Sequence, residues 1–174
     1  MPKKKTSFVM PNDPVLTQIA QIVTPTSLET KNTIEKMLDI AYGHRKNRTK
    51  PTVVGLAAPQ IGISQRVIAV DCSATGNGGL ADMRIYCNPE ISWSSVAEQD
   101  WCEGCWSTDR VCGVVSRSLE VEIQAYTIAG EKVTETYSGY VARIFQHEID
   151  HLNGIEFVNH INDAVRLHWV EEDQ

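Results

Sequence analysis

The residues with the clearest chemical potential in this 174-residue chain form the run His147-Glu148-Ile149-Asp150-His151. Two histidines four positions apart lie on one face of a helix, about 5–6 Å apart at Cβ, so both imidazoles can reach one metal ion. Glu148 would lie roughly 100° around the helix from His147, where its carboxylate can take a proton from a metal-bound water. The pattern is typical of metal-dependent hydrolases, but a polar surface helix can also carry it.

Two histidines do not complete a catalytic metal site, and the third ligand decides the class of the site. A metzincin would continue with a third histidine where this chain has Phe157. A thermolysin-like site would take a downstream glutamate such as Glu171, which lies in an acidic stretch. Cys105 is the remaining candidate, and together with Cys102 it could instead complete a closed structural zinc site with two cysteines and two histidines.

Length and composition predict one globular domain spanning residues 1–174. Apolar residues make up 42% and charged residues 22% of the chain, close to the average for globular proteins. The net charge of -6 makes nucleic acid an unexpected ligand. No apolar stretch is long enough to span a membrane or to form a secretory leader, so we expect a cytoplasmic protein without a membrane partner. Five cysteines are an odd number for a disulfide framework, which favours metal or catalytic use.

Hydrophobic periodicity predicts the elements that position these residues. Helical spacing predicts one helix over 28–42, with Ser27 as its N-cap, and a second over 140–152 that ends at Asn153-Gly154. Strands are expected at 65–71 and 119–125, with weaker candidates at 84–87 and 131–137. Several strands between two helices indicate an α+β fold, in which the second helix carries both histidines.

Three motifs together resemble those of a known family. The segments GLAAPQ at 55–60, EGCWS at 103–107 and QHEIDH at 146–151 are similar, in this order, to the motifs of peptide deformylases. The resemblance extends from residue 13 to residue 155. It implies an α+β fold with mostly antiparallel strands around a C-terminal metal-binding helix. It also implies a metal-dependent hydrolase that removes the N-formyl group from formyl-methionyl termini of nascent polypeptides.

The resemblance implies one divalent metal ion per chain, held by three ligands: Cys105, His147 and His151. Fe²⁺ is the expected native ion, with Zn²⁺, Ni²⁺ or Co²⁺ as substitutes. Three ligands leave an open position for a water nucleophile, with Glu148 as general base and then general acid. Gln60 and the backbone N–H of Trp106 resemble the donors that stabilise the developing oxyanion. Glu103 and Asp150 are candidate hydrogen-bond partners for the imidazoles that bind the metal.

The resemblance also suggests how the peptide substrate is held. An extended peptide would pair with backbone groups of Val54, Gly55 and Gly104. Recognition would then depend on the main chain of the peptide rather than on its side chains. A methionine side chain needs an apolar pocket, and Tyr140 and Ile144 precede His147 on the same helix face as candidate walls. Core packing would explain both residues nearly as well.

The chain departs from the family pattern at several positions. Val53 replaces a usual glycine, Trp106 replaces a common leucine, and residues 108–112 replace a frequent Val-Pro-Gly. Some bacterial relatives carry a basic C-terminal helix that docks on the ribosome, whereas residues 171–173 are acidic here, so the ribosome is only a second candidate partner. The alternatives are a neutral endopeptidase of the HExxH type and a Cys₂His₂ zinc-stabilised binding module.

Overall fold

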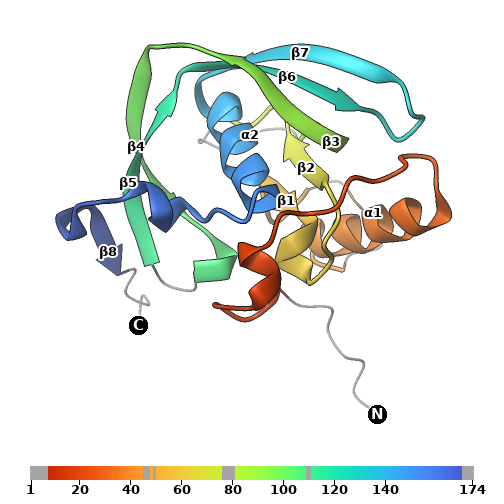
Figure 1. Cartoon of the computed structure of the whole chain (residues 1–174), viewed down its shortest axis with the longest axis horizontal. Helices are drawn as coiled ribbons and strands as arrows, with labels where there is room; N and C mark the ends of the chain where they lie inside the picture. Colours follow the sequence, from red (N-terminus) through yellow and green to blue (C-terminus); the bar gives the residue numbers. More distant parts are fainter. Residues whose placement is uncertain (1–7, 45–47, 49, 76–80, 109–110, 170–174) are drawn as a thin grey trace.

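Two antiparallel sheets and two α-helices form the part of the chain that the computed structural model describes, residues 8–44, 48, 50–75, 81–108 and 111–169 (Figure 1). The larger sheet has the order β1-β2-β3-β6-β7 and consists of β1 (Gly55–Ala57), β2 (Val67–Asp71), β3 (Met83–Ser94), β6 (Glu120–Tyr126) and β7 (Lys132–Ser138). The smaller sheet has the order β4-β5-β8 and consists of β4 (Glu98–Gly104), β5 (Val111–Ser118) and β8 (Leu167–Trp169). The helices are α1 (Leu28–Ala41) and α2 (Gly139–Leu152). This arrangement confirms the predicted α+β fold.

Helix α1 begins where the sequence predicts it. The Ser27 hydroxyl accepts a hydrogen bond from the Thr30 N–H at 3.1 Å, which satisfies one of the free donors at the helix N-terminus. Its apolar face buries Ile34 and Met37 against β1 and β2. The helix therefore fixes the strand that leads into the GLAAPQ segment.

Helix α2 lies at the centre of the molecule and contacts strands of both sheets (Figure 1). Phe145 and Leu152 are completely buried in the core beneath the larger sheet. The helix ends at Asn153, and Gly154 follows with a φ of 71°, where an added Cβ would lie 2.7 Å from the Thr17 carbonyl. Only glycine fits that turn, so the predicted stop signal is confirmed.

Strands β6 and β7 lie within one residue of their predicted bounds and β2 is two residues shorter, whereas β3 runs much further than the periodicity indicates. Strand β3 continues past Pro89, because a register shift between Cys87 and Glu90 and a left-handed Asn88 (φ 50°) accommodate the proline as a bulge. Strands β4 and β5 were not predicted. The sequence of β4 lacks apolar alternation, because its buried inward side chain is the carboxylate of Glu103.

Five short 3-10 helices complete the described part of the fold. Short 3-10 helices lie at Pro14–Thr17, Ala58–Ile61, Trp106–Thr108, Phe157–His160 and Ala164–Arg166. None of the helices in the described ranges is long and apolar enough to cross a membrane.

Candidate metal centre

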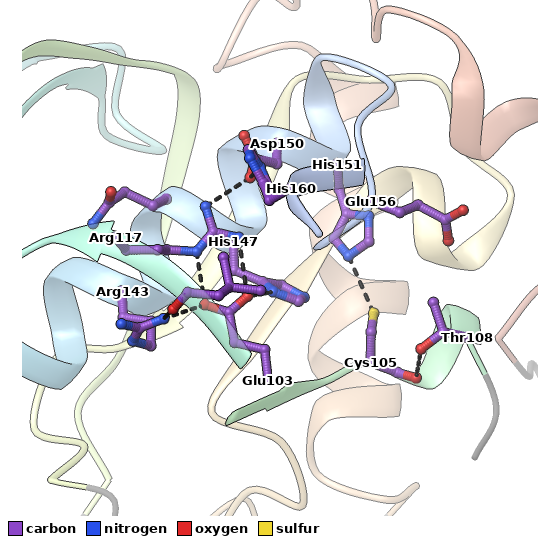
Figure 2. A network of polar contacts seen from close by, with 12 residues as sticks. Glu103, Cys105, Thr108, Arg117, Arg143, His147, Asp150, His151, Glu156 and His160 are labelled. Carbon is purple, nitrogen blue, oxygen red and sulfur yellow. Dashed lines mark hydrogen bonds and ion pairs between the residues drawn. The ribbon is translucent and has the colours of Figure 1, made fainter. Parts of the chain in front are cut away.

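Helix α2 and the end of β4 bring three potential metal ligands together. Single ligand atoms of Cys105, His147 and His151 all lie within 4.8 Å of one another. The Cys105 Sγ is 3.2 Å from His151 Nε2, and the ring centroids of the two histidines are 4.9 Å apart (Figure 2). The i, i+4 spacing on α2 supplies both imidazoles, and the turn after β4 supplies the thiol. The structure thus joins the second and third sequence motifs at one point.

The imidazole of His147 is oriented by Glu103, as the sequence predicted for this carboxylate. His147 Nδ1 lies 3.0 Å from Glu103 Oε2, which leaves Nε2 for a metal (Figure 2). The His147 ring also stacks on Phe157, at a centroid distance of 6.2 Å. Two contacts therefore fix the plane and the tautomer of this imidazole.

Glu103 is itself held by two buried arginines that the sequence analysis missed. Arg117 donates to both carboxylate oxygens, at 2.7 and 3.0 Å, and Arg143 donates to one oxygen at 2.6 Å. Both guanidinium groups are buried, and Arg143 also donates to the Val115 carbonyl at 3.0 Å. The sequence contains one indication for Arg117. Alternate residues of a strand share a face, and Arg117 follows Gly113 and Val115 on the buried face of β5.

Asp150 does not take the predicted role of imidazole partner. Its Oδ2 accepts from Arg117 at 2.7 Å and lies 2.8 Å from Nε2 of His160, which is not one of the clustered ligands (Figure 2). Asp150 therefore positions Arg117 rather than a ligand. The spacing of three residues from His147 placed Asp150 near the site, but its side chain extends toward the smaller sheet and the 3-10 helix Phe157–His160.

Electrostatics favour a thiolate at Cys105 and a charged carboxylate at Glu103. Burial disfavours the thiolate, but hydrogen bonds from His147 and His151 outweigh it and lower the pKa of Cys105 to about 4. Burial likewise opposes a charge on His147, but Cys105 and Glu103 raise the pKa of this imidazole to about 10. Burial also opposes ionisation of Glu103, yet His147 and Arg117 hold its pKa well below the usual range. A thiolate is the form of cysteine that binds metals.

Glu148 lies beside the ligand cluster and is not part of it. It is 4% exposed, and burial raises its pKa to about 7, against the opposing effect of the two imidazoles. Its Oε2 is buried, and no described residue forms a hydrogen bond with it. A carboxylate with a pKa near neutrality and a free oxygen beside a metal site is suited to proton transfer.

Gln60 reaches the ligand cluster from the 3-10 helix that follows β1. Its Oε1 accepts from the Ala57 N–H at 2.7 Å, which directs Nε2 toward Cys105 Sγ at 3.1 Å. Trp106 follows Cys105 and is 61% exposed, and its ring stacks on Phe8 at 5.2 Å between centroids. The contact between Phe8 and Trp106 was not expected from the sequence.

A cleft of about 300 Å³ opens beside the cluster. Its lining includes the sequence-predicted residues Val54, Gly55, Gln60, Gly104, Cys105, Trp106, Tyr140, Ile144, His147 and Glu148. His151 lies behind this surface and is 1% exposed. An added Cβ on Gly55 would lie 2.3 Å from Glu148 Oε1 and 2.7 Å from Ile144 Cγ2, so only glycine lets β1 approach α2 so closely.

The donor set fits a divalent transition metal with an open coordination position. A tetrahedral ion bonded to sulfur at about 2.3 Å and to nitrogen at about 2.0–2.1 Å holds these atoms roughly 3.3–3.6 Å apart, which a cluster within 4.8 Å can reach. Among the described residues the group contains Cys105 but not Cys102, so a closed Cys₂His₂ site lacks its second cysteine. The alternative ligand Glu171 lies outside the described residues.

The comparisons with known proteins agree with the three motifs. A family model described as polypeptide deformylase matches residues 6–166. A peptide deformylase of Thermotoga neapolitana is 41% identical over 155 residues, which cover 89% of this chain and 86% of that protein. Peptide deformylase 2 of Bacillus anthracis is 41% identical over 161 residues, which cover 86% of this chain and 85% of that protein.

Solved structures show the same fold. The peptide deformylase of Synechococcus elongatus in complex with actinonin has a TM-score of 0.80 at 30% identity, covering 95% of this chain and 84% of that chain. The Thermotoga maritima peptide deformylase has a TM-score of 0.75 at 36% identity, covering 90% of this chain and 99% of that chain.

Proposed function

The chain belongs to the polypeptide deformylase family, and we propose that Cys105, His147 and His151 bind the metal ion on which this family depends. The reaction is hydrolysis of the formyl amide at the N-terminus of a nascent polypeptide, with release of formate. The observation that carries the proposal is the convergence of one thiol and two imidazoles beside a cleft that Glu148 and Gln60 also line. The endopeptidase and binding-module alternatives have no comparable support.

We propose one divalent ion per chain, with Fe²⁺ as the native ion. A thiolate with two imidazoles would also accept Zn²⁺, Ni²⁺ or Co²⁺, since selectivity depends on geometry and supply as well as on ligand type. When bound, such an ion lowers the pKa of a coordinated water and so supplies a nucleophile at neutral pH. The contribution of Glu103 is to hold the His147 ring so that Nε2 faces this position.

Glu148 is proposed to carry the proton of the reaction. Its pKa of about 7 lets the carboxylate accept a proton from the attacking water and later return it to the departing amine. Its close packing against Gly55 and its buried position keep bulk water from competing for that proton.

Gln60 and the Trp106 N–H are proposed to stabilise the charge that develops on the formyl oxygen. The Gln60 amide is fixed through Ala57, so its Nε2 is directed at the ligand cluster before substrate arrives. A preorganised neutral donor of this kind stabilises an oxyanion without binding the metal. The stack with Phe8 restrains the ring of Trp106 at the rim of the cleft.

The peptide is proposed to lie extended between two sheet edges. Strand β1 is the edge of the larger sheet and β4 is the edge of the smaller one, and both line the cleft. Gly55 and Gly104 would supply backbone groups for strand addition. Val54 is the third residue proposed to contact the peptide, and its carbonyl accepts from the Asp71 N–H at 2.8 Å, which anchors the start of β1 to the end of β2.

Tyr140 and Ile144 are proposed as walls for the methionine side chain. Both project from α2 into the cleft lining on the side of Gly55, and Trp101 packs near Tyr140 at a centroid distance of 6.3 Å. Formylated chains emerge from ribosomes, so we propose that the protein meets its substrate there, in the cytoplasm. We also propose that residues 1–174 form one catalytic domain, since α2 contacts both sheets.

Metal content tests the ligand assignment independently of activity. Anaerobically purified protein should contain one equivalent of metal, which Cys105→Ser should sharply reduce and Cys102→Ser should leave in place. The reverse pattern would contradict the proposed site. Loss of metal in both variants would favour the closed zinc site instead.

A further inference from the structure

Two cysteines outside the proposed reaction lie on one face of the smaller sheet. The register pairs Cys102 with Val114 and Gly104 with Cys112. Because residues two apart on a strand share a face, both thiols are on the same side of β4 and β5. Cys102 is exposed and Cys112 is partly exposed, whereas Glu103 on the opposite face is buried against His147. The thiols are therefore on the face of the strands opposite Glu103, and Cys102 also lies in the lining of the cleft.

Gly104 leaves the space between these two thiols open. A Cβ at position 104 would lie 3.7 Å from the Cys112 Cβ, so any side chain there would cover Cys112 on the β4 side. With glycine in place, the nearest β4 side chain on this face is Cys102, the diagonal neighbour of Cys112. Burial and then the neighbouring Cys112 thiol raise the pKa of Cys102, as expected where two thiols share one space.

The strand geometry brings the pair close to the range of a disulfide. Diagonal neighbours on antiparallel strands are about 7–8 Å apart at Cα, and disulfides span Cα distances up to roughly 6.8 Å. Strand β4 is an edge strand, paired only with β5, so it can make the small approach that remains.

The other three cysteines lie in other surroundings and are not placed to pair with Cys102. The Cys105 sulfur lies 3.1 Å from Gln60 Nε2 and faces the ligand cluster. Cys87 is fully buried in β3. Cys72 lies 3.6 Å from a tyrosine hydroxyl at the larger sheet. Cys112 is therefore the partner that the fold offers to Cys102.

We propose that Cys102 and Cys112 form a redox modification site, in which a low-molecular-weight disulfide such as glutathione disulfide converts the two thiols into a reversible cross-strand disulfide. The exposed Cys102 thiolate attacks one sulfur of glutathione disulfide, forming a mixed disulfide and releasing one glutathione thiolate. The Cys112 thiolate then attacks the Cys102 sulfur and releases the second. The two thiol protons pass to the two glutathione thiolates, so one disulfide is reduced as the other forms.

The bond would act on the cleft through Gly104. It closes the segment 102–112, which contains Gly104 and Cys105, and it draws the edge strand β4 toward β5. Gly104 lines the cleft, so we expect the oxidised protein to bind peptide more weakly and to show a higher KM. This consequence, unlike the bond itself, rests on the proposed peptide binding at Gly104.

Peptide mapping tests the bond directly. Metal-loaded protein is treated with glutathione disulfide, the remaining thiols are alkylated, and the protein is denatured and digested with trypsin without reduction. Cleavage after Arg84, Arg110 and Arg117 yields peptides 85–110 and 111–117, the second of which contains Cys112 alone. We expect these peptides to remain joined, lighter by two hydrogen atoms than their sum, and to separate with dithiothreitol.

Matched variants identify the partner. The joined peptides should disappear in Cys102→Ser and persist in Cys105→Ser, because both cysteines lie in peptide 85–110. The KM should rise severalfold in the oxidised wild type, return with dithiothreitol, and stay unchanged in Cys112→Ser treated in the same way. A link that persists in Cys102→Ser, or glutathione adducts without any link, would overturn the proposed bond. An unchanged KM in the linked protein would overturn its proposed effect on peptide binding at Gly104.

Discussion

The close approach of β1 to α2 predicts that Gly55→Ala disables the enzyme without removing its metal. The new Cβ would lie 2.3 Å from Glu148 Oε1 and 2.7 Å from Ile144 Cγ2, far inside van der Waals contact. Relief of such overpacking typically costs about 1–3 kcal/mol of stability, and the Glu148 carboxylate must move. Because general acid–base catalysis contributes roughly 10²–10⁴-fold, we expect turnover to fall by about 10²-fold or more.

The assay compares formate release, metal content and thermal unfolding of the purified variant with the wild type. A domain of this size should lose about 2–4 °C in Tm per kcal/mol. The metal should stay bound, because the atoms nearest to the new Cβ belong to Glu148 and Ile144 and not to a proposed ligand. The double variant Gly55→Ala/Glu148→Ala should turn over no more slowly than Glu148→Ala alone. Near wild-type turnover in Gly55→Ala, or multiplicative losses in the double variant, would refute the reasoning.

Three further substitutions test individual groups. Glu148→Ala should keep its metal but lose about 10²–10⁴-fold in turnover; metal loss with unchanged turnover per bound ion would contradict its role. Gln60→Leu should lower turnover by about 10²–10³-fold at similar size, because it removes an oxyanion donor. Glu103→Gln leaves Arg117 and Arg143 buried without their shared carboxylate, so urea unfolding should show a loss of about 3–5 kcal/mol. Stability equal to the wild type would show that these ion pairs contribute nothing.

The elements with local signals are those that sequence reasoning placed correctly. Helix α2 has a strong apolar periodicity and a glycine stop, so its bounds and its histidine face follow from nearby residues. Strand β4 has no such signal, because the burial of Glu103 depends on arginines 14 and 40 positions away in the sequence. Long-range ion pairs of this kind do not appear in any local pattern.

In the candidate site too, some features could be predicted from sequence motifs and others depend on contacts between distant segments. The spacing of His147 and His151 predicted a shared metal site, and the resemblance of the three motifs implied that Cys105 and Gln60 join it. The structure brings these four residues together. The contact of Phe8 with Trp106 and the orientation of Asp150 toward His160 depend on how distant segments pack. Helix spacing could place Asp150 near the site but could not choose its partner.

Formate release from formyl-Met-Ala-Ser by the metal-loaded protein tests the central claim most directly. The cleft holds Gln60 and Trp106 close to the ligand cluster, which suits a small terminal acyl group. We predict rapid release of formate, much slower hydrolysis of the acetylated peptide, and no internal cleavage of casein. Cleavage of casein without formate release, or no hydrolysis by folded protein with one bound metal, would contradict the account.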